Sequence, residues 1–417
     1  MTNYTKKSIL VIDNGLFLHF AEHLTEYFGT VYYWSPWVSA FPKSNSLIVG
    51  QGVPGITRVR SIWEVADEVD LFVFLDIGYG QLQDYLAGIG KRVWGSRLGE
   101  ELELDRVWAK QKATDLGISI GPYSVIRGID DLRSFLRDNP DQYVKVSTLR
   151  GDAETFYSSD YELVEPRLDQ LEWVLGIRKH WTEFIVETAI HDAIEIGYDG
   201  YTIDGAFPKE ALFGIEVKDK GYLGETMPYS DLPSSLIDIN KKLLPYLREQ
   251  KYRGIFSSEA RVRGDEYFLI DPCCRVPSPP GELYGVLISN WADILWEGSD
   301  GELVDPVFTA KFAAGLVLVS EWARDNWQPV VYPDSISDFV RLKNYSVIDD
   351  RRYVIPQTIC PIDTIGVVVG TGSTAEEAIR KTQRNAEQIE GLGIDFGVGV
   401  LEDALEQFNA LKEGTDG

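Results

Sequence analysis

The pattern of secondary structure changes about a quarter of the way along the chain, and this change limits the folds open to it. Buried-type strands at Ser8–Asp13 and Asp70–Asp76 alternate with segments of helical spacing such as Leu16–Phe28. Strands that alternate with helices form parallel sheets, because a parallel crossover needs a helix-length connection. Residues 1–98 are therefore expected to form a small open α/β domain, and a helix is predicted next at Glu101–Leu116.

The remainder of the chain indicates antiparallel strands mixed with helices. Asp199-Gly200, between two strand-like runs, is a strong signal for a β-hairpin. Near the C-terminus the strand-like run Thr364–Gly370 precedes a capping box that opens a helix at Thr374. We predict a central unit over residues 99–300 and a closing domain over residues 301–417.

One predicted hairpin carries a carboxylate on each strand. Gly254–Arg275 has the pattern of two strands around a Gly-Asp turn, with Glu259 on the first strand and Asp271 on the second. If Gly264–Glu266 form a three-residue loop, the two carboxylates face each other with Cβ atoms about 5 Å apart. Like charges this close are tolerated mainly around a cation, and hard oxygen ligands suit Mg²⁺. The alternative is a solvated hairpin face whose charges serve solubility.

Charge and composition exclude some classes of partner. A formal net charge of -25 over 417 residues argues against duplex nucleic acid or an anionic membrane, because both bind a basic face. No apolar run approaches the length of a membrane span, and the N-terminus lacks a signal-peptide pattern. The cysteines, Cys273, Cys274 and Cys360, lack zinc spacing, and the adjacent pair is expected to be buried. These features predict a cytoplasmic monomer or small homo-oligomer.

Several segments together resemble the ATP-grasp ligases, and most closely the phosphoribosylamine–glycine ligase family. Leu102–Lys110 is similar to the family segment L-E-x-S-K-x-x-A-K, and Tyr143-Val-Lys145-Val is similar to a strand that follows it. The resemblance implies that Lys110 and Lys145 contact the phosphates of ATP, and that the loop Ser147–Thr155 closes over them. Without the resemblance, a strand lysine such as Lys145 would be read as an exposed edge residue.

A second segment resembles the adenosine-binding part of that family. Ile185–Ile190 is similar to the hinge that receives adenine. The resemblance implies that Glu187 and the backbone near Ala189 and Ile190 bind the base, and that Glu195 holds the ribose hydroxyls.

A third segment resembles the metal-binding motif E-x-N-x-R-x-G-D-P of the family. In Ile270–Pro279, Asp271 replaces the Glu and Cys273 replaces the Asn ligand, whereas Arg275 matches. The resemblance implies that Glu259 and Asp271 hold Mg²⁺, with Mn²⁺ as the alternative, and that Arg275 contacts the substrate carboxylate or acyl phosphate. The thiol is a departure, because sulfur is a poor ligand for Mg²⁺.

The resemblance covers roughly residues 8 to 400 and implies a fold and an activity. The implied fold is the ATP-grasp fold, α/β and α+β, with an N-terminal Rossmann-like domain and a small C-terminal α/β domain. Its central unit would consist of a small lobe at about 120–190 and a large lobe at about 190–300. The implied activity is an ATP-dependent carboxylate–amine ligase that joins a small carboxylic acid and an amine through an acyl phosphate.

The segments that would select the substrate differ from the family. Asp13-Asn14-Gly15 stands where the signature G-G-R-E-H is expected, and Asp76-Ile-Gly replaces G-P-E. Three interpretations therefore stay open: a ligase with other substrates, the purine-pathway enzyme with drifted motifs, and a degenerate ATP-grasp protein that binds nucleotide or a partner without turnover. Gly370–Ala375 has the spacing of a dinucleotide fingerprint, but the domain around it is expected to be too small for that role.

Overall fold

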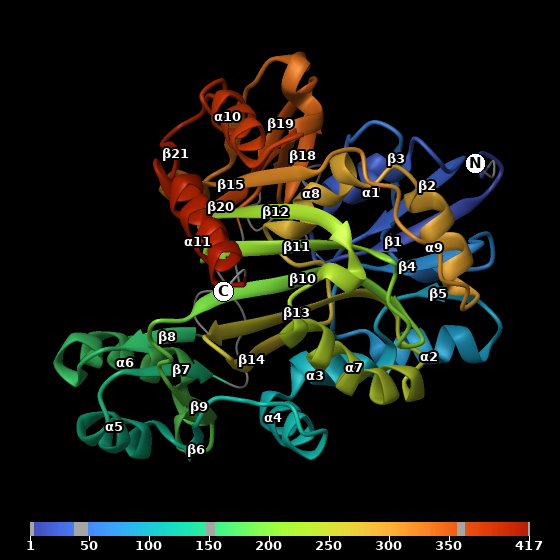
Figure 1. The fold of residues 1–417 in the computed structure, drawn as a ribbon. Coiled ribbons are helices and arrows are strands. Elements are labelled where there is room, and N and C mark those ends of the chain that lie inside the picture. The colour runs from blue at the N-terminus through green and yellow to red at the C-terminus, as the bar shows by residue number, and fades with distance from the viewer. Residues whose placement is uncertain (1–3, 37–48, 147–154, 357–362, 416–417) are drawn as a thin grey trace. The chain divides into compact units, whose positions relative to one another are not determined.

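The structure, a computed structural model, describes residues 4–36, 49–146, 155–356 and 363–415. The predicted phosphate-covering loop lies outside the described residues except for Thr155, and Cys360 lies outside them as well. Figure 1 traces the described chain, which divides into a larger compact unit of residues 1–100, 195–259 and 272–417 and a smaller one of residues 101–194 and 260–271. The predicted domain boundaries near residues 98 and 300 remain predictions.

A parallel sheet forms the N-terminal part of the larger unit. Its strand order is β3-β2-β1-β4-β5, and all neighbouring strands are parallel. Residues Ile9–Ile12 are fully buried, as expected for a parallel strand covered on both faces. The predicted α/β pattern is confirmed, although the first helix is shorter than predicted. The elements are β1 (Ser8–Ile12), α1 (Leu18–Leu24), β2 (Thr30–Trp34), β3 (Ile56–Arg58), β4 (Leu71–Phe74), α2 (Gly80–Gly88) and β5 (Arg92–Trp94).

A second, largely antiparallel sheet forms most of the remaining larger unit. Its strands run in the order β13-β10-β11-β12-β15-β20-β17, and β21 pairs with β15. A separate three-stranded sheet has the order β16-β19-β18. The strands are β10 (Ile194–Ile203), β11 (Glu210–Val217), β12 (Gly221–Pro228), β13 (Arg253–Arg263), β15 (Phe312–Ser320), β16 (Gln328–Val330), β17 (Val340–Leu342), β18 (Tyr345–Ile348), β19 (Arg351–Val354), β20 (Thr364–Gly372) and β21 (Ile394–Phe396).

The hairpin predicted at Asp199-Gly200 is wrong, because β10 runs straight through both residues. A tight type I′ turn needs positive φ at both central residues, and neither belongs to the described residues with positive φ. Asp199 instead pairs with Leu212 of β11 and accepts a hydrogen bond from the Tyr222 hydroxyl at 2.6 Å. A buried tyrosine partner thus satisfies the aspartate inside a strand.

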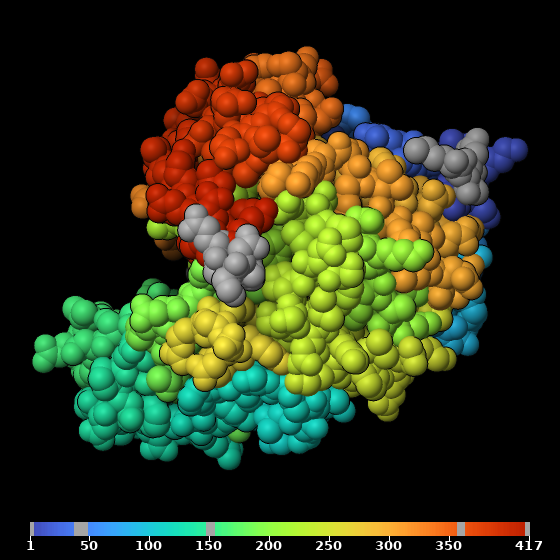
Figure 2. Space-filling model, viewed as in Figure 1, coloured from blue at the N-terminus to red at the C-terminus, as the bar shows by residue number. Residues whose placement is uncertain are grey.

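Helices cover the second sheet of the larger unit. Helix α10 packs on β15 and β20, and α11 packs on β11 and β12. The predicted capping box is confirmed, since Thr374 Oγ1 accepts from the Glu377 N–H at 3.2 Å. Figure 2 shows these red C-terminal segments directly beside the yellow-green segments of the same unit. The helices are α7 (Ser234–Glu249), α8 (Pro280–Leu287), α9 (Trp291–Ser299), α10 (Ala375–Ala386) and α11 (Val400–Thr415).

The smaller unit is a four-stranded sheet with helices on one face. The strand order is β6-β9-β7-β8, and α5 and α6 share a buried apolar core with β7, β8 and β9. The helix predicted at Glu101–Leu116 is interrupted at Asp105, whose carboxylate caps the second part by accepting from the Trp108 N–H. The elements are α3 (Glu101–Leu104), α4 (Arg106–Asp115), β6 (Tyr123–Arg127), α5 (Ile129–Asp138), β7 (Gln142–Val146), β8 (Thr155–Ser158), α6 (Tyr161–Leu175), β9 (Glu183–Thr188) and the part of the β13–β14 hairpin at 260–271, where β14 spans Glu266–Cys273.

None of the helices in the described residues has the length and apolar character needed to cross a membrane.

Candidate functional site

Two buried lysines share carboxylates in the smaller unit. Lys145 Nζ lies 2.7 Å from Asp271 Oδ2 and 3.1 Å from Glu187 Oε2. Lys110 Nζ forms an ion pair with Glu187 Oε1, and it also donates to the Ile270 carbonyl at 3.3 Å. Four predicted site residues therefore meet here, and we call Lys110, Lys145, Glu187 and Asp271 the lysine–carboxylate cluster.

Strand alternation places this cluster on the face of the sheet away from α5 and α6. Val144 and Val146 belong to the helix-facing core, so Lys145 between them points to the opposite face. On the neighbouring strand Glu187 is paired with Tyr143, which puts Glu187 diagonally beside Lys145. Lys145 is only 5% exposed, and this contradicts the alternative of an exposed edge lysine.

Burial and ion pairing act in opposite directions on the pKa values in the cluster. Burial disfavours the charged form of Lys145, but the nearby Asp271 and Glu187 outweigh it and raise the pKa of Lys145. Burial likewise disfavours ionised Asp271, yet Lys145 and then Arg106 hold the pKa of Asp271 well below its usual range. The pKa of Glu187 is also lowered, because its two lysine partners outweigh burial. These shifts favour the charged forms of Lys145, Asp271 and Glu187 at neutral pH.

The backbone groups predicted to bind adenine take part in hydrogen bonds within the smaller unit. The Ala189 N–H donates to the Asp141 carbonyl at 3.1 Å. The Ile190 carbonyl accepts from Arg261 Nη1 at 3.0 Å. A bound base would share or replace these bonds, and the base-binding roles of Glu187, Ala189 and Ile190 remain predictions.

In the larger unit, Lys218 lies among carboxylates from neighbouring strands. Its Nζ is 3.8 Å from Glu216 Oε1. Glu216 has the largest effect on the pKa of Lys218, which it raises. Burial opposes this shift, and Glu259, Glu195 and Asp219 add to it. The predicted ribose residue Glu195 and the predicted metal ligand Glu259 therefore gather around one lysine, although they are 64 positions apart in the sequence.

Glu216 belongs to this group, and the sequence analysis missed it. Burial raises the pKa of its carboxyl group to about 7, with Lys218 lowering it and Glu195 raising it. Gly197 of β10 pairs with Gly214 of β11, and this register continued by two residues sets Glu195 opposite Glu216. The available signal was the Glu216 carboxylate in the otherwise apolar run 211–217 of β11.

Arg275 follows β14 and lies beside the end of the N-terminal parallel sheet. Its Nη1 lies 3.5 Å from the Val276 carbonyl, and the Val276 N–H donates to the Leu75 carbonyl at 3.0 Å. Cys273 and Cys274 are buried, as predicted. The Cys273 thiol donates to the Arg275 carbonyl at 3.5 Å, so it packs against the backbone of the residue predicted to contact the substrate.

The described residues offer carboxylates for a metal without forming a complete metal cage. Among them, no three His, Cys, Asp or Glu side chains are grouped so that they could hold an ion alone. The expected three-residue loop is wrong, because Gly264 and Asp265 form a two-residue connection bridged by an Arg263–Glu266 ion pair of 2.9 Å. With this connection Glu259 falls opposite Ile270 instead of Asp271, so the predicted facing of the two carboxylates is wrong as well. Mg²⁺ commonly binds one or two carboxylates together with nucleotide phosphates, and the metal-binding roles of Glu259 and Asp271 remain predictions.

The ammonium groups of Lys110 and Lys145 are also suited to bind the phosphates of a nucleotide. Buried ammonium groups are stable only beside negative charge, and in the cluster carboxylates supply that charge. Phosphate oxygens are acceptors of the same kind and carry more charge. The smaller unit therefore holds a cationic pair that can exchange protein carboxylates for phosphates.

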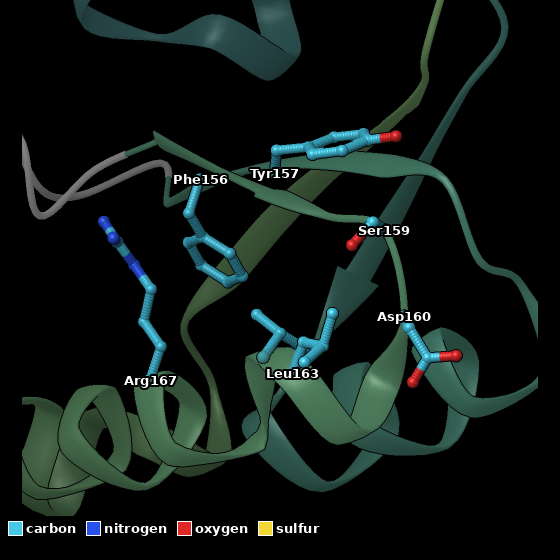
Figure 3. Close-up of a pocket in the computed structure, with 7 residues that line it drawn as sticks. Phe156, Tyr157, Ser159, Asp160, Leu163 and Arg167 are labelled. Atoms are coloured by element: carbon cyan, nitrogen blue, oxygen red, sulfur yellow. The ribbon is translucent and has the colours of Figure 1, made fainter.

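A surface pocket of about 200 Å³ lies elsewhere on the smaller unit, between β8 and α6. Figure 3 shows Phe156 and Leu163 on its apolar side and Arg167 at its rim. The Arg167 guanidinium lies 5.0 Å from the centre of the Phe156 ring. No predicted site residue lines the pocket, so it is separate from the lysine–carboxylate cluster.

Comparison with solved structures identifies the fold. No protein-family model matches the sequence, and no curated protein matches it. Phosphoribosylamine–glycine ligase from Thermotoga maritima matches with a TM-score of 0.69 and 16% identity, covering 93% of this chain and 98% of that chain. The biotin carboxylase domain of Hydrogenobacter thermophilus 2-oxoglutarate carboxylase, in complex with MgADP, ADP and bicarbonate, has a TM-score of 0.65 and 11% identity, with coverages of 96% and 98%.

A third solved structure supports the same conclusion. N5-carboxyaminoimidazole ribonucleotide synthetase from Thermotoga maritima has a TM-score of 0.60 and 14% identity, covering 93% of this chain and 99% of that chain. Each of these similarities extends over nearly the whole length of both chains. The predicted ATP-grasp fold, with its N-terminal Rossmann-like and small C-terminal α/β parts, is confirmed.

Proposed function

We propose that this chain, which has the ATP-grasp fold, is an ATP-dependent carboxylate–amine ligase. The observation that carries the proposal is the buried pair Lys110 and Lys145, both of which form ion pairs with Glu187. A charge clamp of this kind is what phosphoryl transfer requires, because catalysis rests on positioning and neutralising the phosphates. Similar solved structures include complexes with MgADP and with ADP, and this supports nucleotide use.

The proposed reaction has two steps. A carboxylate oxygen of the first substrate takes the γ-phosphoryl group, which breaks the bond to ADP and gives an acyl phosphate. The amine nitrogen of the second substrate then forms a C–N bond at the acyl carbon, while phosphate leaves and the nitrogen loses a proton. Lys110 and Lys145 bind phosphates, Arg275 binds the substrate carboxylate, and Glu259 and Asp271 are the proposed ligands of Mg²⁺ or Mn²⁺. Glu195 is the proposed ribose contact.

A thermal-shift experiment with ATP or ADP, with and without Mg²⁺, tests nucleotide binding. At a ligand concentration of about 100 Kd, binding is expected to stabilise the wild type by about 2.7 kcal/mol. Lys145→Ala is expected to lose most of this increment, since it removes a phosphate contact from a buried site. Lys179→Ala is the matched control, because Lys179 lies in the same unit but pairs with Glu172 at the surface, 2.6 Å away. A full nucleotide shift in Lys145→Ala would remove Lys145 from the scheme.

A second candidate is a nucleotide-binding protein without turnover. It is favoured by Cys273, a buried thiol where a metal-binding Asn is expected. The two candidates differ in one measurement, the release of inorganic phosphate from ATP in the presence of acid and amine mixtures. Metal-dependent release that needs both an acid and an amine supports the ligase. Nucleotide binding with no release for any mixture favours the second candidate.

A further inference from the structure

Helix α6 of the smaller unit carries apolar side chains on two opposite faces. Its inner face contributes to the buried core with Val164, Leu168, Leu171 and Leu175. On its outer face Leu163 is 77% exposed, Trp173 is 85% exposed and Val174 is 49% exposed. Ile177, which follows in the short helix η4 (Gly176–His180), is 77% exposed as well. A helix that is apolar on both faces normally packs against a second surface, and no described residue covers the outer face.

The exposed residues have the spacing of a contact between two helices. Leu163, Gln170 and Ile177 recur every seven positions, and Pro166 and Trp173 follow the first two of them by three positions. This is the heptad spacing of a helix–helix seam, in which a polar residue at one central position fixes the register of the pair. All of them are exposed. We call the set the outer stripe, and it consists of Leu163, Pro166, Gln170, Trp173, Val174 and Ile177.

The outer stripe has the same pattern in both directions from Gln170. Leu163 and Ile177 lie seven positions before and after Gln170. Pro166 and Val174 lie four positions before and after it. Two copies of α6 that pack antiparallel around a two-fold axis at Gln170 therefore place apolar residues opposite apolar residues. The two Gln170 amides then meet on the axis, where each has both a donor and an acceptor to offer the other.

The pocket between β8 and α6 lies opposite the exposed tryptophan in this arrangement. Leu163 and Arg167 line the pocket, whose volume is about 200 Å³ (Figure 3). Arg167 is three positions before Gln170 and Trp173 is three positions after it, so Trp173 of the second copy reaches the level of Arg167. One face of the Arg167 guanidinium lies over Phe156, and the other can stack on an indole ring. An aromatic side chain seated in a pocket is typical of the strongest contacts in protein interfaces.

Charges at the two ends of the outer stripe are complementary in the same arrangement. Glu162 and Arg178 are both exposed and lie eight positions before and after Gln170. In the antiparallel pair Glu162 of each copy faces Arg178 of the other, and the two helix dipoles also oppose each other favourably. A parallel pair would instead bring the two Glu162 side chains together. Because the net charge of -25 makes two chains repel, this local attraction favours the antiparallel arrangement.

We infer that the outer stripe is a two-fold interface between two copies of this chain. The exposed apolar side chains of α6 and η4 offer roughly 500 Å² on each copy, so a pair would bury about 1,000 Å² in total. That area is near the lower limit for a specific interface, and the dimer is expected to be reversible, with a dissociation constant on the order of 10 μM. The interface does not depend on the ligase function proposed above.

Sedimentation velocity of the full chain tests the interface. A monomer–dimer equilibrium is expected between about 1 and 100 μM. Trp173→Glu brings a charge to the pocket of the second copy and is expected to raise the dissociation constant at least about thirtyfold. Val398→Glu is the control, because Val398 is 93% exposed in the larger unit, and it is expected to leave the equilibrium unchanged. A chain that stays monomeric over this range, or a dimer that Trp173→Glu leaves intact, overturns the inference.

Reversal of the end charges tests the antiparallel arrangement. Glu162→Arg and Arg178→Glu each place like charges opposite each other at both ends of the interface, so each is expected to weaken association about tenfold. The double variant exchanges the two charges and is expected to return to within about threefold of the wild type. A double variant that associates no better than the single variants contradicts the antiparallel arrangement.

A cysteine at Gln170 tests the position of the two-fold axis. Two copies of Gln170→Cys bring their thiols together on the axis, so mild oxidation is expected to give a disulfide-linked dimer. Glu165→Cys is the control, since Glu165 is exposed on the same helix but lies outside the outer stripe. The wild type under the same oxidation accounts for linkage through the native cysteines. Equal linkage of Gln170→Cys and Glu165→Cys contradicts an axis at Gln170.

Discussion

At the scale of single residues, Glu187 has a position that its sequence context did not indicate. It lies between Lys110 and Lys145, one from a helix and one from a neighbouring strand, and forms an ion pair with each, while Asp271 pairs with Lys145 as well. Loss of Glu187 would leave both buried lysines with less counter-charge. Removing one partner of a buried ion pair typically costs about 3–5 kcal/mol, because the remaining charge stays desolvated.

Glu187→Gln tests this role. Without nucleotide the variant is expected to lose about 3 kcal/mol of stability, since two buried lysines lose their shared counter-charge. Saturating ATP is expected to restore part of the loss, because phosphates then supply negative charge. Melting temperatures with and without ATP provide the measurement. Glu183→Gln, at the exposed first residue of the same strand, is the control, and equal destabilisation of the two variants would contradict the role assigned to Glu187.

Asp13 gives a prediction about pH. Its pKa is raised to about 7 in the folded chain, chiefly by burial, whereas the ordinary value is 3.8. Between these values the unfolded chain is ionised and the folded chain still binds the proton. The wild type therefore loses stability as pH rises from about 4 to about 7, by on the order of 4 kcal/mol, and the loss levels off above that range.

The comparison of Asp13→Asn with the wild type isolates this effect from other titrations. The asparagine cannot ionise, so the stability of the variant relative to the wild type is expected to increase between pH 5 and pH 7 and to level off near pH 8. Melting temperatures of both proteins at half-unit steps of pH provide the measurement. A difference that stays constant over this range would show that Asp13 ionises normally in the folded chain.

At the scale of secondary-structure elements, helix α4 connects local sequence to the site. Asp105 ends α3 and caps α4 by accepting from the Trp108 N–H at 3.0 Å. Lys110 follows on the second turn of α4, so the cap fixes the start of the helix that presents a proposed phosphate contact. One continuous helix was predicted because the apolar spacing runs through Asp105, and the cap was visible only as an Asp at that position.

Asp105→Ala is expected to lower stability by about 1 kcal/mol, the usual cost of losing an N-cap. The ATP-induced shift is expected to fall by a small amount, since Lys110 becomes less well positioned. Asp105→Ser keeps a capping oxygen and is expected to retain both properties. Differential scanning fluorimetry with and without ATP measures them, and identical behaviour of the Ala and Ser variants would exclude a capping role.

At the scale of the whole molecule, the proposed nucleotide site and the proposed dimer interface can be tested independently of each other. The lysine–carboxylate cluster is on the face of the four-stranded sheet away from α5 and α6, whereas the outer stripe is on the exposed face of α6. Amide hydrogen exchange followed by mass spectrometry is expected to show slower exchange in β7 and β9 when ATP is added. Amide exchange in the sheet β16-β19-β18 is expected to stay the same when ATP is added. Protection confined to that three-stranded sheet would contradict the assigned nucleotide site.

Local sequence patterns were sufficient to predict the order and type of most elements. The apolar runs of β1 and β4, the capping box at Thr374 and the lysine-bearing strand β7 follow local periodicity and capping, which depend on residues close together in the chain. The net charge of -25 likewise argued against duplex nucleic acid or an anionic membrane as a partner. Predictions failed where a tertiary partner decided the outcome, as when Tyr222 satisfies Asp199 and allows β10 to continue through a turn-like pair.

The tertiary structure alone decided which charged residues meet. Lys110, Lys145, Glu187 and Asp271 are spread over 162 positions, and nothing local to any of them specifies the others. Glu216 was missed for the same reason, because its neighbours Glu195 and Lys218 reach it only through strand pairing and a turn. Hydrophobic periodicity is a local property of the chain, whereas the free energy of a buried charge depends on whichever partners folding brings to it.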